Sequence, residues 1–263
     1  MTGLDPTDPR PPAEQIAAHL RAQIQSGDLP EGAKLPSTNQ LVDQYGVASS
    51  TARRATGILI GEGLAIGKTG AGVFVRRARP MVQIGTQRYS RRTRQAGQPA
   101  LRAEAEAAGM VSRQEIRELA EVPAPDWVAA AYGIEPGTPV FARRRTELID
   151  DEPHQLADSY YTLALIAEAP KLGEVVTGPG GGFARIEDAG WVFREYEERL
   201  IARMPAPEEI AGLQLPPGVP IVRKRRFAWA SKAEGDPFTL VEAFESILRA
   251  DRVELAYQFP APE

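Results

Sequence analysis

The sequence predicts an α+β protein of two domains, an N-terminal winged helix-turn-helix and a C-terminal domain built on an antiparallel sheet. The first domain is indicated by two helical segments joined at a glycine and followed by two short strands around a glycine-rich tip, all within residues 36–75. The second is indicated by an internal repeat, each copy of which combines a short helix with two strands. A chain of 263 residues is long enough for each domain to bury its own core.

The central element of the first domain is the segment 49–62, which the residue pattern predicts to be a helix. Ser49 or Ser50 can cap its first turn, because a short hydroxyl accepts hydrogen bonds from the amide groups there. At 100° per residue, one side of this helix is small and apolar. That side consists of Ala52, Ala55, Thr56 and Leu59. The other side carries Ser50, Arg54 and two glycines, with Arg53 on the flank, and so allows close approach to a large polyanion.

The segments on either side of this helix complete the predicted motif. Ser37 can cap a short helix over 38–45, and Gly46 allows the tight turn that joins the two helices. Residues 63–76 read as the two strands of a wing. An amphipathic helix over 13–26, ended by a glycine, is expected to pack behind the other two.

Positive charge is concentrated near this motif, although the net charge of the chain is −4. Ten Lys and Arg residues lie between Thr51 and Arg94, against one acid, Glu62. Such segregation gives one module a positive potential and favours a nucleic-acid partner over a solvated basic stretch without one. The arginine-rich residues 77–99 are expected to be a flexible linker, with direct minor-groove contact as the alternative.

The motif resembles the winged helix-turn-helix of the GntR family of transcription regulators. The resemblance rests on Leu-Pro-Ser at 35–37, Tyr-Gly-Val at 45–47, Arg53 and Gly-Ala-Gly-Val-Phe-Val at 70–75. Asn39 and Ser49 stand where the family has two DNA-contacting arginines, so an operator unlike the family's common one is expected. The resemblance implies DNA contacts by Ser37, Asn39, Ser49, Ser50, Thr51, Arg53, Arg54, Lys68, Gly70 and Gly72.

The second half of the chain contains the internal repeat. Its matched blocks are 122–126 with 204–208, 132–140 with 213–221, 143–145 with 224–226, 152–153 with 236–237, and 156–158 with 240–242. Two copies of a helix and a hairpin predict one domain with pseudo-twofold symmetry, an antiparallel sheet and helices packed against it. In this alignment Asp158 and Glu242 are equivalent acids. Chance similarity of proline-rich turns is the alternative explanation.

The repeat region also resembles the UTRA effector-binding domain of HutC-like GntR regulators, which has a chorismate-lyase-like fold. The resemblance rests on the Pro-Gly-x-Pro turn, the arginine-bearing strand, Ala-Asp-Ser-Tyr-Tyr at 157–161, the glycine-rich loop and Ala-Asp-Arg at 250–252. It implies a homodimer that represses transcription from a double-stranded DNA operator with an inverted repeat, and that releases DNA when a small-molecule effector binds.

The effector-binding residues implied by the resemblance come from the strands and the glycine-rich loop. They are Arg143, Arg145, Asp158, Gly181, Gly182, Phe183 and Glu242. Alternation along a strand places Arg143 and Arg145 on one face and Arg144 on the other. A structural ion pair is the alternative role for these arginines and acids. The glycine-rich loop could equally be a mobile loop, and Arg144, Lys224 and Arg225 are expected to face solvent or a dimer partner.

Other classes of function find little support in the sequence. No catalytic residues, metal site or cofactor are identified, so the protein is not expected to be an enzyme. A chorismate-lyase-like enzyme and a ligand-independent plasmid-maintenance or architectural DNA-binding protein remain alternatives. No apolar run is long enough to span a membrane and there is no cysteine, so a cytoplasmic location is expected. The expected organisation is a disordered N-terminus (1–12), a DNA-binding domain (13–76), a linker (77–99) and an effector-binding domain (100–263).

Overall fold

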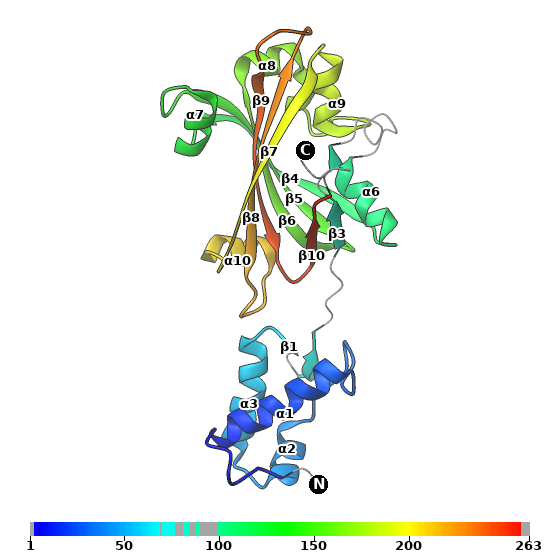
Figure 1. Ribbon diagram of the computed structural model, residues 1–263, viewed down its shortest axis with the longest axis vertical. Helices are drawn as coiled ribbons and strands as arrows, with labels where there is room; N and C mark the ends of the chain where they lie inside the picture. Colours follow the sequence, from blue (N-terminus) through cyan, green and yellow to red (C-terminus); the bar gives the residue numbers. More distant parts are fainter. Residues whose placement is uncertain (1–2, 69, 77–80, 85–87, 90–98, 259–263) are drawn as a thin grey trace, which may run out of the picture. The chain divides into compact units, whose positions relative to one another are not determined.

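The computed structural model describes residues 3–68, 70–76, 81–84, 88–89 and 99–258. The chain divides into two units, residues 1–79 with 215–219 and residues 80–214 with 220–263 (Figure 1). In the described parts of both, no helix combines the length and the apolar character needed to cross a membrane.

The first unit is a three-helix motif followed by a small antiparallel hairpin. Its elements are α1 (Pro12–Ser26), α2 (Thr38–Tyr45), α3 (Ser49–Gly61), β1 (Ala65–Lys68) and β2 (Gly72–Val75). Helix α1 ends at Gly27 and α2 at Gly46, both with positive φ, which glycine adopts without a steric penalty. The hairpin pairs Ala65 with Val75 and Lys68 with Gly72. The predicted winged helix-turn-helix is therefore confirmed.

The core of the first unit is formed by the helical faces that the apolar spacing predicts. Ala52, Ala55 and Leu59 of α3 are fully buried, and Thr56 is nearly so. They pack with apolar residues of α1, α2 and the hairpin in one cluster. That cluster includes Ile16, Ala17, Leu20, Leu41, Tyr45, Ala65 and Val75.

The segment ahead of α1, expected to be disordered, is held by a side chain of the helix in its described part. Gln15 accepts a hydrogen bond from the backbone N–H of Asp5 at 3.0 Å and donates to the carbonyl of Arg10 at 2.9 Å. The side chain of Asp5 accepts from the backbone N–H of Thr7, and that of Asp8 from the N–H of Arg10. Local capping of this kind satisfies backbone groups without burial of apolar surface.

The second unit is built on a six-stranded antiparallel sheet with the order β4-β5-β6-β9-β8-β7. The strands are β4 (Ser112–Pro123), β5 (Pro139–Ile149), β6 (Glu152–Thr162), β7 (Val192–Arg203), β8 (Ile221–Ser231) and β9 (Thr239–Arg249). A twofold rotation that exchanges β4 with β7, β5 with β8 and β6 with β9 leaves this strand order unchanged. This is the pseudo-twofold arrangement that the internal repeat predicts.

The strand register gives the equivalent residues of the two halves. Arg144 pairs with Asp158 across β5 and β6, and Arg225 pairs with Glu245 across β8 and β9. The β5–β6 and β8–β9 pairings are each interrupted once, after Glu147 and after Ala228, which are equivalent positions.

This register corrects the alignment of the repeat. The residue equivalent to Asp158 is Glu245 rather than Glu242, and the residue equivalent to Glu242 is Gln155. The turn between β5 and β6 is short (150–151) and the loop between β8 and β9 is long (232–238), so matching their Glu-Pro and Asp-Pro dipeptides displaced the second strands.

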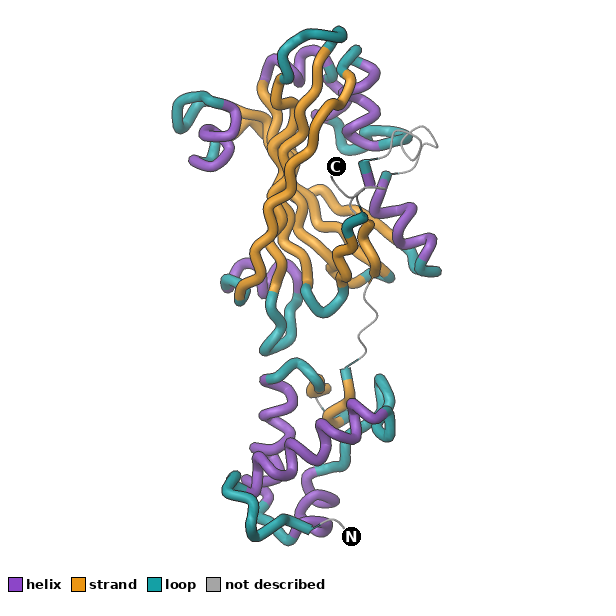
Figure 2. The backbone as a smooth tube through the Cα atoms, in the orientation of Figure 1, coloured by secondary structure: helices purple, strands orange, loops and turns teal. Residues whose placement is uncertain are grey.

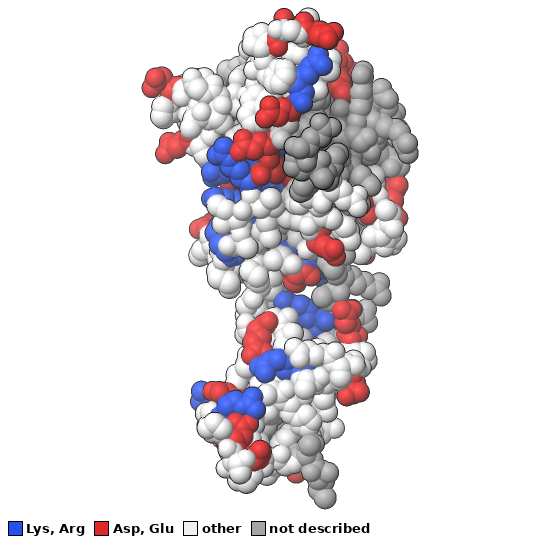
Figure 3. Space-filling model, viewed as in Figure 1, with Lys and Arg blue, Asp and Glu red and all other residues white. Residues whose placement is uncertain are grey.

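Helices and a second small sheet cover parts of both faces of the large sheet (Figures 1 and 2). On one side lie α6 (Ala100–Ala107), α8 (Leu163–Glu168), a 3-10 turn (Pro170–Gly173) and α9 (Gly181–Asp188). On the other side lie α7 (Asp126–Tyr132) and α10 (Pro207–Leu213). Basic and acidic side chains are interspersed on the face seen in Figure 3, in keeping with the many ion pairs of this unit.

Part of the stretch expected to be a linker belongs to the second unit. Strand β3 (Met81–Ile84) runs parallel to β10 (Val253–Ala256), with Met81 opposite Val253. The Met81 side chain is buried in a cluster with Leu101 and Ile149. These four residues therefore form a strand of the second unit and are not a flexible connector. The arginines at 77, 79, 91, 92 and 94 lie outside the described residues.

Candidate functional site

The first candidate surface is the exposed side of α2 and α3 in the first unit. Ser37 and Gln40 form a reciprocal capping box, in which the Gln40 N–H donates to the Ser37 hydroxyl at 3.3 Å and the Ser37 N–H donates to the Gln40 side chain at 2.8 Å. The hydroxyl of Ser37 therefore already stabilises the start of α2. Asn39, the second residue after the N-cap, is exposed, and no described residue forms a hydrogen bond with its side chain.

The start of α3 differs from the prediction. Its N-cap is Ala48, which makes no side-chain cap, so neither Ser49 nor Ser50 caps the helix. Both serines are instead the first two helical residues and are exposed, and Arg53 and Arg54 are exposed one turn later. The hydroxyls and guanidinium groups at this end of α3 are therefore exposed to solvent and do not cap the helix.

Two further basic side chains lie beside Phe74 of the hairpin, one from the hairpin itself and one from the segment before α2. The ammonium group of Lys68 lies 5.1 Å from the centre of the Phe74 ring and that of Lys34 lies 5.9 Å from it. Gly72 has a φ of 116°, and a Cβ there would come within 2.8 Å of the Lys34 side chain. Gly70, at the tip, also has a positive φ. Sequence reasoning missed Lys34, because it precedes the recognised motif; its bridge to Phe74 places it beside the wing.

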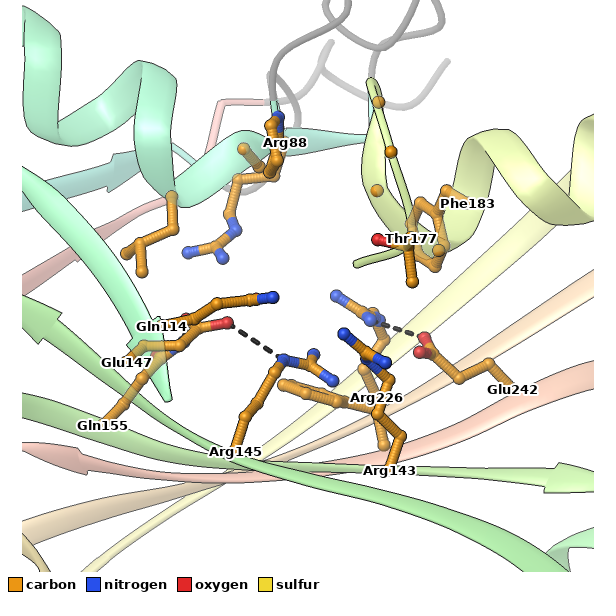
Figure 4. A pocket seen from close by; sticks show the side chains of 18 of the residues that line it. Arg88, Gln114, Arg143, Arg145, Glu147, Gln155, Thr177, Phe183, Arg226 and Glu242 are labelled. Carbon is orange, nitrogen blue, oxygen red and sulfur yellow. Dashed lines mark hydrogen bonds and ion pairs between the residues drawn. The ribbon is translucent and has the colours of Figure 1, made fainter. Parts of the chain in front are cut away.

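The second candidate site is a pocket in the second unit, on the sheet face that carries Arg143, Arg145 and Arg226, here called the pocket face (Figure 4). The cavity has a volume of about 260 Å³. The sheet forms its floor, while the glycine-rich loop, the start of α9 and residues 88–89 and 99–101 form its walls. The structure thus brings together six of the seven predicted effector-binding residues, all except Asp158.

Arg143 is the most unusual cation of the pocket. It is 3% exposed, and its guanidinium donates to the carbonyl oxygens of Glu174 and Val175, the latter at 3.0 Å. Burial, followed by the neighbouring charge of Arg145, lowers the pKa of Arg143. Among the described residues no carboxylate lies within ion-pair distance of it. Arg145, by contrast, donates to Glu147 at 3.2 Å and to the hydroxyl of Ser159 at 3.2 Å.

Glu242 is held by an arginine that sequence reasoning missed. Arg226 donates to Glu242 at 2.5 Å, and Tyr161 donates to the other oxygen of Glu242 at 3.0 Å. Burial is the largest single influence on Glu242 and raises its pKa, but the charge and hydrogen bond of Arg226, together with the charge of Arg145 and a hydrogen bond from Ser159, outweigh it, so the pKa lies below its ordinary value. Arg226 is equivalent to Arg145 in the repeat, and that equivalence was the signal that could have identified it.

The glycine-rich loop places backbone against the pocket. Gly180 is the N-cap of α9, with a φ of 77°, and Gly181 and Gly182 are the first helical residues. A Cβ on Gly182 would come within 3.2 Å of the Tyr161 hydroxyl and 3.4 Å of the Leu172 side chain, so a larger residue there would require these neighbours to shift. Phe183 lies with its ring centre 4.7 Å from the guanidinium of Arg226. The loop thus directs the start of α9 towards the cations of the floor.

Asp158 lies on the opposite face of the sheet and does not line the pocket. It accepts a hydrogen bond from Arg117 and lies 3.6 Å from Arg144. Burial raises the pKa of Asp158 despite these two cations. Its place follows from alternation, because it pairs with Arg144 rather than with Arg143 or Arg145. Asp158 was predicted to line the effector site together with Glu242, and the structure places only Glu242 there.

Lys224 is also placed differently from the prediction. It was expected to face solvent or a dimer partner, but it is 1% exposed on the pocket face of β8. Its ammonium group lies 3.2 Å from the Gln83 side chain and 3.7 Å from Glu198. Burial lowers the pKa of Lys224 to about 7. Glu104, which lies 3.1 Å from Arg88, has a pKa raised by burial to about 7.

Known proteins match both units of the chain. The UTRA domain family matches residues 107–254, and the family of bacterial regulatory proteins called gntR matches residues 12–75. An uncharacterized HTH-type transcriptional regulator of Streptomyces coelicolor is 30% identical over 96% of this chain and 94% of its own. The histidine utilization repressor of Pseudomonas aeruginosa is 26% identical over 85% of this chain and 84% of its own.

A solved structure gives the same assignment over almost the whole chain. The crystal structure of a GntR-family transcriptional regulator matches with a TM-score of 0.62 and 25% identity, over 96% of this chain and 99% of the other. With a helix-turn-helix matched at 12–75, a UTRA domain matched at 107–254 and a full-length relative at 30% identity, the chain belongs to the gntR family of bacterial transcription regulators that carry a UTRA domain.

Proposed function

We propose that the protein is a ligand-responsive repressor that binds a duplex DNA operator as a homodimer and is released when a small anion occupies the pocket. The observation that carries the proposal is the presence, in one chain, of an exposed helix-turn-helix surface and a buried cationic cavity. The family membership supports both halves, since related proteins are named transcriptional repressors. Binding to the operator would take place in the cytoplasm, where the chromosomal DNA of bacteria is found.

The DNA-binding half is supported by the residues at the start of α3. Ser49, Ser50, Arg53 and Arg54 are exposed together, and Arg53 can form the bidentate contact that reads a guanine. One recognition helix reads only a few base pairs, so two protomers on an inverted repeat, with half-sites about 34 Å apart, supply specificity. Asn39 favours adenine over guanine, which supports an operator different from that of relatives with arginine there.

The ligand-binding half is supported by the composition of the pocket. Four arginines and two glutamates line it, so the lining carries an excess of positive charge. The start of α9 adds backbone N–H groups and the positive end of a helix dipole. A DNA-binding protein without a ligand has no need for this cavity, and an enzyme would need a nucleophile or general base free to react. Tyr161, Glu242, Arg226, Arg145 and Glu147 are instead engaged with one another or with Ser159.

The DNA-binding half is tested by selecting bound sequences from a random duplex pool and measuring affinity for the selected site. We expect Arg53→Ala to weaken binding to this site by about 1–3 kcal/mol. Arg102→Ala, on the exposed side of α6, is the control and should leave the affinity unchanged. Equal affinity for the selected site and for scrambled DNA at physiological salt would contradict specific binding.

The coupling of the two halves is tested by titrating a ligand into the protein with and without the selected operator. If ligand and DNA oppose each other, operator must weaken the ligand by the factor by which ligand weakens operator, typically about 5- to 150-fold. Ligand affinity that does not change with operator would contradict release by this route.

A further inference from the structure

Among the described residues, every arginine that lines the pocket except Arg143 has a carboxylate within ion-pair distance. Arg145 is paired with Glu147, Arg226 with Glu242, and Arg88 with Glu104. Arg143 contacts only backbone carbonyls among the described residues, so one positive charge remains without a carboxylate. A buried charge is stable only when it is compensated. The pocket therefore favours a ligand that brings a single negative charge to Arg143.

The position of Arg143 also says where the charged group of the ligand lies. Arg143 and Arg226 stand in the middle of the floor, below Thr177 and beside the start of α9 (Figure 4). A carboxylate there can accept hydrogen bonds from guanidinium groups and from the backbone N–H groups of α9.

Two amides and a carboxylate form a row at the other end of the pocket. The strand register places Gln114 of β4, Glu147 of β5 and Gln155 of β6 side by side on the pocket face. Figure 4 shows these three side chains together on one side of the central arginines. Glu147 lies four residues from Arg143 along β5, about 13 Å at 3.3 Å per residue. A ligand of several bonds is needed to reach both ends.

Gln155 leaves an acceptor without a partner at this end. It is 2% exposed, and its amide nitrogen donates to Glu147, which fixes the orientation of the amide group. Its carbonyl oxygen is buried and accepts no hydrogen bond from the described residues. An unpaired buried acceptor costs free energy that a ligand hydroxyl or N–H can recover. The carboxylate beside Gln155, that of Glu147, is already paired with Arg145, so an uncharged donor is sufficient to satisfy this acceptor.

We propose that the pocket selects a small monoanion whose carboxylate-like head binds at Arg143 and the start of α9, and whose opposite end is an uncharged hydrogen-bond donor, such as an alcohol, received by Gln155. The inference rests on the proposed ligand-responsive function and specifies the chemical class of the ligand. The pocket discriminates by charge at one end and by hydrogen bonding at the other. A second charge, of either sign, is rejected at the Gln155 end.

The test uses four six-carbon probes that share a carboxylate and differ only at the far end. Hexanoate, 6-hydroxyhexanoate, 6-aminohexanoate and adipate end in a methyl, a hydroxyl, an ammonium and a second carboxylate. Calorimetric titration of the full chain should show 6-hydroxyhexanoate binding about tenfold more tightly than hexanoate, the gain expected for satisfying one buried acceptor. The ammonium and dicarboxylate probes should bind more weakly than the alcohol.

Two variants at one position distinguish recognition from mere packing. Gln155→Leu should abolish the difference between 6-hydroxyhexanoate and hexanoate while hexanoate still binds. Gln155→Glu places a second carboxylate beside Glu147 and should make 6-aminohexanoate the preferred probe. Thermal unfolding of each variant checks that the second unit remains folded. A preference for the alcohol that survives Gln155→Leu would overturn the assignment of this residue.

Arg143→Met separates failure of the inference from failure of the proposed function. All four probes should lose at least about tenfold in affinity in this variant, because a hydrogen bond to a charged group is lost. If no probe binds the wild-type chain, or if binding ignores Arg143, the proposed anion pocket itself fails. If probes bind through Arg143 with the same affinity whatever their far end, or if adipate binds best, only the monoanion-alcohol inference fails.

Discussion

The two halves of the sheet in the second unit place a buried cation at equivalent positions but surround it differently. Arg143 on β5 lines the cavity and donates hydrogen bonds to two backbone carbonyls. Its equivalent on β8, Lys224, is enclosed by Gln83 of β3 and Glu198 of β7. The repeat therefore holds two equivalent buried cations, of which one is enclosed by the chain's own side chains and the other lines the cavity.

The comparison extends to the residues next to each cation. Arg145 and Arg226 are equivalent, yet their acids come from different places: Glu147 lies on the same strand as Arg145, whereas Glu242 lies on the strand next to Arg226. At the position equivalent to Glu242 the first half has Gln155, a neutral side chain. The first half is thus less saturated with ion pairs, which suits a site that exchanges ligands.

The largest expected effect on stability comes from removing Glu242, the acid that pairs with Arg226 in the second half of the sheet. Glu242→Gln leaves the guanidinium of Arg226 buried without a carboxylate, and the free energy of unfolding should fall by about 3–5 kcal/mol. Gln155→Leu, at the equivalent position, removes one hydrogen bond and should cost about 1 kcal/mol. Chemical denaturation of the second unit measures both. Similar losses for the two variants would mean that the halves are equally dependent on their polar contacts.

The next largest expected effect is a difference between Lys224 and its equivalent, Arg143, in how stability depends on pH. The folded pKa of Lys224 is about 7, below its value of 10.5 in the unfolded chain, so between these values the unfolded chain binds more protons. Stability from this group therefore rises with pH above 7, by about 2 kcal/mol between pH 7 and 9. Lys224→Met should remove that rise.

Arg143→Met is the matched control for this pH effect. A guanidinium keeps its proton throughout the range from pH 7 to 9, so replacing Arg143 should leave the slope of stability against pH unchanged. The free energies of unfolding of the wild type and both variants, measured at pH 7, 8 and 9, provide the comparison. An unchanged slope in Lys224→Met would show that Lys224 carries its proton throughout this range.

Local periodicity explains which parts of the structure were predictable from the sequence. The buried face of α3 follows from residue spacing alone, and its residues Ala52, Ala55 and Leu59 lie in the core as expected. Alternation along β5 likewise placed Arg143 and Arg145 on one face and Arg144 on the other. Helix caps were less predictable, because the N-cap of α3 is Ala48, which has no capping side chain and precedes the two serines.

Long-range placement explains what was not predictable. The burial of Lys224 depends on β3, a strand from a stretch whose arginines and glycines indicated a linker. Arg226 was missed because its partner, Glu242, lies on another strand, and only the register brings them together. The roles of these residues in ligand binding stay predictions until a ligand is identified.

The smallest expected effect tests the corrected register of the repeat. Asp158 and its equivalent, Glu245, lie directly opposite each other on β6 and β9, on the face away from the pocket. Their arginine partners, Arg144 and Arg225, are about a quarter to a third exposed, so solvent weakens these ion pairs. Asp158→Asn and Glu245→Gln should each change the free energy of unfolding by less than about 1 kcal/mol, because these ion pairs are partly exposed to solvent and each change also removes repulsion between two facing acids. Neither variant should alter hexanoate affinity by more than about twofold. A loss from Asp158→Asn as large as that from Glu242→Gln, or a loss of hexanoate binding, would restore the equivalence of Asp158 with Glu242 and contradict the register.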